Sequence, residues 1–221
     1  MTSLVWDGLV ASNFFREPEI KLRHELADAA KSQSWVRVLE ILRENLRLVN
    51  VTRPDGKALY APLHQAAHGG AGVEVVEALL EMGAWRCLRT SEGKRPVDIA
   101  AGLGRTHLLG VLQPAEVRQV PAEALATVQR TFHELIRWRA GHLPTFPGLR
   151  LPELEVLLEF PPMSRCGFSI PGMYGGFSFE LVRDGEDPML VTESWCRVAG
   201  GSGQRHEITV TGATLVEEGF V

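Results

Sequence analysis

The chain has 221 residues, of which 45% are hydrophobic and 23% charged, and its formal net charge is −4. This composition is typical of a globular protein, and the length suits one large domain or two small ones. No apolar run is long enough to cross a membrane, and the first residues lack the basic flank and apolar stretch of a secretory signal. We therefore expect a cytoplasmic protein that does not enter a membrane.

The cysteines and the distribution of charge narrow the class further. Cys87, Cys166 and Cys196 cannot all pair within one chain, and none lies in a Cys-x-x-Cys spacing, so we expect a reduced protein. The excess of acidic residues lies in the second half of the chain. This distribution argues against nucleic acid as a partner and allows a basic one.

The first elements along the chain are two predicted helices. Residues 1–16 carry scattered apolar side chains without a clear period, and we expect them to cap the unit that follows. A helical pattern begins at Leu22, and Ser34 is a suitable N-cap for a second helix with apolar residues on one face. These two helices form a first unit over residues 22–53.

The next stretch carries the strongest signal. In a second unit, residues 54–88, Pro-Leu-His begins at Pro62, two alanines follow, and an apolar stripe leads to Gly83. Proline suits the first turn of a helix, and Gly83 falls where a helix end favours a left-handed residue. The pattern returns in weaker form from Pro96, in a third unit over residues 89–113. A period of about 33 residues indicates stacked supersecondary units.

These two patterns in register resemble the ankyrin repeat family. The resemblance implies an α-solenoid of ankyrin-like helix-turn-helix repeats, three in number, which fills residues 1–113 with its N-terminal cap and is of bacterial type. The chain departs from the family pattern at Arg95 and at residues 57–60, which lengthen the turn before Pro62. The alternative is an ordinary helical domain with a chance Pro-Leu-His.

The second half of the chain differs in character. Residues 114–144 are expected to hold a helix from Ala122 to Arg139, which closes the stack or bridges to the next part, and then a linker. Residues 145–221 are predicted to form a small α+β domain with an antiparallel sheet, which we assign to no family. Its expected elements are a short helix at 153–159 and strands at 177–182, 189–198, 205–210 and 213–216.

Candidate binding residues follow from the resemblance, because partners of ankyrin-like proteins usually lie against the projecting turns and the inner helix face. The corresponding residues are Tyr60, Gln65, His68, Trp85, Arg86 and Arg89. An aromatic ring beside two arginines, as at Trp85, has the composition of an interface hot spot. The alternative is that Trp85 packs on a neighbouring repeat or on the second domain.

A second candidate surface, for a small ligand or another partner, lies in residues 145–221. It comprises Tyr174, Trp195, Arg197, Gln204, Arg205 and His206. The Gly-rich turn at Gly200–Gly203 can aim backbone N–H groups at an anion, while the arginines and His206 supply charge or a proton. The turn lacks the Lys-Ser/Thr of a nucleotide P-loop, and a flexible hairpin tip is the simpler interpretation.

Other reactive side chains give no site. His64 and His68 share one helix face at a spacing that zinc can use, but no third ligand is evident. By the resemblance, His64 forms a structural hydrogen bond at the repeat turn. Cys196 precedes Arg197, yet strand alternation directs its thiol toward the core. We predict no catalytic residue, no metal and no cofactor.

Two functional hypotheses remain. The first is a non-catalytic module that binds a protein partner, similar to bacterial immunity or inhibitor proteins with ankyrin repeats that occlude a toxin or an enzyme. The second is an enzyme or a small-ligand-binding accessory protein that uses the C-terminal Arg/His surface, with the repeats as a docking arm. The partner's identity and the oligomeric state do not follow from the sequence.

Overall fold

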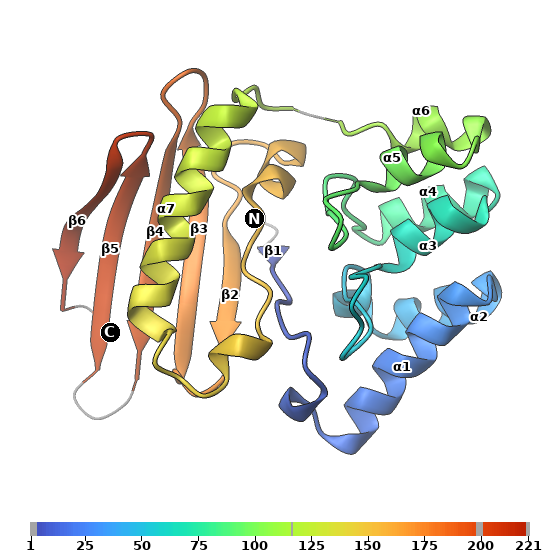
Figure 1. Ribbon diagram of the computed structural model, residues 1–221, viewed down its shortest axis with the longest axis horizontal. Coiled ribbons are helices and arrows are strands. Elements are labelled where there is room, and N and C mark those ends of the chain that lie inside the picture. The colour runs from blue at the N-terminus through green and yellow to red at the C-terminus, as the bar shows by residue number, and fades with distance from the viewer. Residues whose placement is uncertain (1–3, 116, 198–200, 220–221) are drawn as a thin grey trace. The chain divides into compact units, whose positions relative to one another are not determined.

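The computed structural model describes residues 4–115, 117–197 and 201–219 (Figure 1). The chain forms two compact units. The helical unit comprises Leu9–Ala115, and the sheet unit comprises Met1–Gly8 together with Glu116–Val221.

The helical unit consists of helices joined by short turns. Its elements are η1 (Ser12–Phe14), α1 (Glu17–Lys31), α2 (Trp35–Glu44), η2 (Leu46–Leu48), α3 (Pro62–Gly69), α4 (Val73–Glu81), α5 (Pro96–Gly102), η3 (Thr106–Leu108) and α6 (Leu109–Leu112). Helix α3 contacts both α1 and α5, and α4 contacts both α2 and α6. The helices therefore pack as three successive pairs, one in each of the predicted units (Figure 1).

The start of α3 explains the Pro-Leu-His pattern. Pro62 occupies the first helical turn after Ala61, whose backbone is extended. The buried His64 ring accepts a hydrogen bond at Nδ1 from the Ala61 N–H (3.2 Å), so Nε2 carries the proton and donates to the Leu88 carbonyl (2.9 Å). The imidazole thus joins the start of α3 to the turn after α4, which confirms its structural role.

The same bond recurs one repeat later with a different side chain. At the start of α5, Asp98 Oδ2 accepts a hydrogen bond from the Arg95 N–H (2.8 Å). Ala66 and Ala67 of α3 and Ala100 of α5 are fully buried, so the first helices of successive pairs approach closely. Gly83 ends the second pair with φ 95°, as predicted from its position.

In its described residues, the sheet unit has one long helix and six strands. Its elements are β1 (Leu4–Val5), α7 (Ala122–Ala140), η4 (Phe146–Gly148), η5 (Leu154–Glu159), β2 (Cys166–Ile170), β3 (Gly175–Arg183), β4 (Met189–Cys196), β5 (Ser202–Thr209) and β6 (Gly212–Glu218). The strands lie in the order β1-β2-β3-β4-β5-β6. All neighbours are antiparallel except β1 and β2, which are parallel, so the sheet is mixed.

One face of this sheet is apolar and lies against α7 (Figure 1). The Phe132 ring from α7 packs against Phe177 and Phe179 of β3, with ring centroids 6.1 and 5.1 Å apart. On the opposite face, Glu180 and Glu193 are half-buried. The sheet therefore has the alternation of a two-layer structure with one solvated side.

The structure divides the chain differently from the predicted ranges 1–113, 114–144 and 145–221. Residues Leu4 and Val5 do not cap the repeats but pair with Cys166 and Gly167 of β2, and the Trp6 indole donates to the Arg150 carbonyl (2.9 Å). Helix α7, predicted to close the stack or to bridge to the next part, belongs to the sheet unit and covers the apolar face of the sheet. The expected helix at 153–159 is the 3-10 helix η5, and β2 was not predicted.

Substitution of His64 by alanine is expected to lower the free energy of unfolding of the helical unit by about 2–4 kcal/mol, because it leaves a cavity and an unpaired Leu88 carbonyl. Denaturant unfolding measures this change. His68→Ala, four residues further along α3 on an exposed position, is the control and should stay within about 0.5 kcal/mol. Equal effects of the two substitutions would contradict the assigned role.

The three free thiols are expected to differ in reactivity. Burial raises the pKa of the Cys166 thiol to about 12, and Cys87 is fully buried, whereas Cys196 is partly exposed. In a titration of the native protein with Ellman's reagent, Cys196 should react first, and Cys87 and Cys166 only on unfolding. Rapid modification of Cys166 in the native protein would contradict this order.

Candidate functional site

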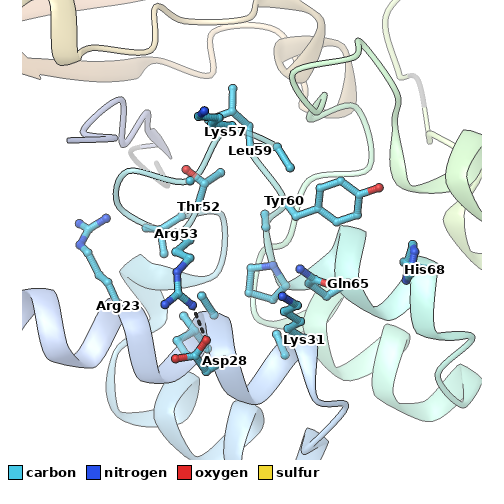
Figure 2. Close-up of a pocket in the computed structure, with 18 of the residues that line it drawn as sticks. Arg23, Asp28, Lys31, Thr52, Arg53, Lys57, Leu59, Tyr60, Gln65 and His68 are labelled. Atoms are coloured by element: carbon cyan, nitrogen blue, oxygen red, sulfur yellow. Dashed lines mark hydrogen bonds and ion pairs between the residues drawn. The ribbon is translucent and has the colours of Figure 1, made fainter. Parts of the chain in front are cut away.

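A groove of about 690 Å³ lies in the helical unit (Figure 2). It is formed by the C-terminal half of α1, the loop of residues 51–61 and one side of α3. The side chains labelled in Figure 2 are Arg23, Asp28, Lys31, Thr52, Arg53, Lys57, Leu59, Tyr60, Gln65 and His68.

The loop of residues 51–61 is held in place by hydrogen bonds to both sides. The Asp55 carboxylate accepts a bond from the Ser12 N–H (3.0 Å). Hydrogen bonding from the Ser12 side chain, and then from this N–H, lowers the pKa of Asp55. The Ser91 N–H, in the next turn, donates to the Ala58 carbonyl (3.1 Å). Leu59 has φ 56°, a left-handed conformation that is unfavourable for leucine. The extra residues 57–60 therefore form a fixed projection and not a loose insertion.

Three of the predicted binding residues lie together in this groove. The Tyr60 ring lies 5.7 Å from the His64 ring and 6.1 Å from the His68 ring, measured between centroids. In Figure 2 the Tyr60 phenol points toward His68, and Gln65 lies below it on α3. Tyr60 is half-buried and His68 exposed, so the groove presents an aromatic surface that a partner can contact.

The other three predicted binding residues, Trp85, Arg86 and Arg89, do not line the groove. Trp85 is 5% exposed, and its backbone N–H donates to Asn50 Oδ1 (2.9 Å). The expectation that its ring forms an exposed hot spot is therefore wrong, and the alternative of a packed ring is correct. The tryptophan lies at the junction of two repeats, where packing removes the surface that a partner needs.

The two arginines also make bonds within the helical unit. Arg86 Nε donates to the Val111 carbonyl in α6 (3.0 Å), and Arg89 Nη1 donates to the Gly93 carbonyl (2.5 Å). Arg86 thus connects the second helix pair to the third through a hydrogen bond. Sequence reasoning missed Lys31 and Arg53 of the groove, because α1 and the loop meet only when the repeats stack.

In the sheet unit, the predicted second surface is divided between two faces. Ser194 pairs with Gln204 and Thr192 with His206, and these side chains are buried on the α7 side. Trp195 and Arg205 alternate with them and lie on the other face. The interpretation of all six residues as one surface is wrong, because successive strand residues point in opposite directions.

Tyr174 and Arg197 are close to each other at one end of the sheet. Tyr174, in the β2–β3 turn, is 74% exposed, and its carbonyl accepts a bond from the Arg197 N–H (3.3 Å). Of the Gly200–Gly203 turn, Gly200 lies outside the described residues.

A partly buried polar cluster lies where β5 and β6 meet α7. Arg139 Nη2 donates to Ser202 Oγ (3.2 Å), and Gln204 Nε2 donates to Glu218 Oε1 (2.7 Å). Burial, and then the charge of Arg139, lowers the pKa of His206, while Glu218 opposes this effect. The imidazole is therefore neutral at neutral pH and makes the sheet unit sensitive to acid.

Metal sites and membrane-spanning helices are two further features to consider in the described part of the chain. Within it, no group of three or more His, Cys, Asp or Glu side chains is placed to hold a metal ion. None of the helices in the described ranges has the length and apolar character needed to cross a membrane.

Acidification is expected to destabilise the sheet unit through His206. Because the folded pKa lies below the ordinary value, the unfolded chain binds the proton more readily, and stability falls as the pH drops from 7 through 6. Denaturant unfolding at pH 7 and pH 5 should show a smaller loss for His206→Gln than for the unchanged protein. His133, whose pKa burial also lowers, gives a separate contribution that His133→Gln removes. An identical pH dependence with and without His206 would contradict the prediction.

Comparison with known proteins supports ankyrin repeats in part of the chain. No protein family model matches the sequence. A segment of 54 residues is 46% identical to ankyrin repeat and SOCS box protein 11 of Danio rerio. The match covers 24% of this chain and 18% of that protein. It agrees with the repeat pattern and with a protein–protein interaction module, and it extends to neither the bacterial type nor the sheet unit.

Proposed function

We propose that the protein is a non-catalytic interaction module that binds a protein partner through the groove of its helical unit. The observation that carries the proposal is the meeting of Tyr60, Gln65 and His68 in one groove beside a fixed projecting loop. Aromatic side chains in a preorganised concave surface bind partners at little entropic cost. The similarity to an ankyrin repeat protein supports this assignment.

The specific role that we propose is that of an immunity or inhibitor protein of bacterial type, which occludes a toxin or an enzyme. This role rests on the resemblance of the repeats to ankyrin-containing inhibitors. It requires a partner with an activity that stops when the complex forms. The arrangement of three helix pairs as a continuous α-solenoid belongs to the same proposal, as does a cytoplasmic location.

The alternative of an enzyme or ligand-binding protein loses its main support, because Gln204 and His206 lie on a different face of the sheet from Trp195 and Arg205. We therefore place the first contact with a partner on the repeats.

Substitution of Tyr60 by alanine is expected to weaken binding to the partner by tenfold or more, on the scale of an interface hot spot of about 2 kcal/mol. Affinity capture from the native cell with the full chain identifies the partner, and calorimetry measures its affinity. His68→Ala, an exposed change in the same groove, should also weaken binding.

The matched control is Tyr174→Ala, which removes the other tyrosine of the chain, from an exposed turn of the sheet unit. It should leave the affinity unchanged. Loss of binding with Tyr174→Ala alone would move the interface to the sheet unit and refute the proposal. An assay of the partner's activity with and without the protein then tests the inhibitor role.

A further inference from the structure

We propose that the groove binds an acidic, extended peptide segment of the partner protein, an inference that rests on the proposed function. The charges of the side chains that line the groove support this proposal. Asp28 forms an ion pair with Arg53, as the dashed line in Figure 2 shows. Glu92 forms an ion pair with Lys94 (2.8 Å). Both acidic side chains of the lining are thus neutralised by neighbouring cations.

Two lysines of the lining remain available to a ligand. Lys31, at the end of α1, and Lys57, in the loop, are exposed, and no ion pair or hydrogen bond is found for either among the residues that the structure describes. Figure 2 shows Lys57 at the tip of the loop and Lys31 beside Gln65, on the opposite side of Tyr60. The groove therefore offers positive charge on both sides of an aromatic centre.

Residues 58–60, which follow Lys57 in the loop, contribute apolar surface to the groove. Leu59 and Tyr60 are half-buried, and Ala58 is exposed. A complementary segment carries carboxylates for the two ammonium groups and an apolar side chain that lies against the Tyr60 ring. Charge pairs of this kind at the rim of a groove mainly determine which partner binds and how fast.

A nucleic acid is the competing anionic ligand, and the lining fits it less well. Phosphate backbones are bound by continuous tracks of Lys and Arg, and each contact adds to the salt dependence. Here the two exposed lysines stand on opposite sides of Tyr60 and form no continuous track, since Asp28 and Glu92 pair with the neighbouring cations. Two separated ammonium groups suit two spaced carboxylates on a peptide.

The test is selection from a displayed library of random heptapeptides with the full-length protein as bait. The unchanged protein should enrich heptapeptides that carry Asp or Glu next to an apolar residue. The double variant Lys31→Glu/Lys57→Glu should lose them and enrich Lys- and Arg-containing ones instead. For one selected acidic heptapeptide, the double variant should weaken binding at least about tenfold.

Lys21→Glu is the matched control. It makes the same charge reversal at an exposed residue of α1 that lies outside the groove. It should select the same acidic peptides as the unchanged protein. Selection without acidic enrichment, no selected peptide at all, or acidic peptides that still bind the double variant would overturn the inference. So would a fluorescent single-stranded oligonucleotide that binds the groove and is not displaced by the acidic peptide.

These outcomes separate the inference from the proposed function. If Tyr60→Ala abolishes binding of the captured partner while Lys31→Glu/Lys57→Glu leaves it intact, the groove is the interface and its ligand is not acidic. If neither variant affects the partner, the proposed function itself fails.

Discussion

The helical unit depends on the two hydrogen bonds of one buried imidazole. Through them His64 ties the start of α3, at Ala61, to the turn that follows α4, at Leu88. Both partners are backbone groups, so the bonds fix the path of the chain rather than one side chain. Because buried backbone groups must be paired, the position tolerates few other residues. The loop of residues 51–61 ends at Ala61, so the position of this residue helps to determine the shape of the groove.

The packing of the helices and turns also preorganises the groove. Small alanines let α3 approach α1 and α5, and the approach brings α1 side chains opposite a loop that is separated from them in the chain by α2 and η2. The surface is therefore a product of stacking, and it exists only when adjacent repeats are both folded. Such a surface loses little entropy when a partner binds.

The sequence allowed the local features to be predicted and left several long-range ones open. Pro62, His64 and Gly83 were interpretable because each reports a backbone requirement of its own turn. The parallel pairing of β1 with β2 could not be foreseen, since Leu4 and Cys166 are joined only by the folded chain.

The candidate site shows the same limit. Tyr60, Gln65 and His68 followed from their places in the repeat, whereas the burial of Trp85 depends on what packs around it. In the sheet unit, the two-residue period of a strand places Gln204 and Arg205 on opposite faces of β5, and the sequence alone was enough to predict this.

The pairing of β1 has a consequence for the order in which the protein forms. The whole helical unit is an insertion between β1 and the rest of the sheet unit. On the ribosome, β1 emerges before the inserted repeats and cannot pair until β2 has been made, whereas the repeats are rich in local contacts and can fold as soon as they emerge. The first strand of the unit thus waits longest for its partner, and excision of the inserted repeats with rejoined ends would shorten that wait.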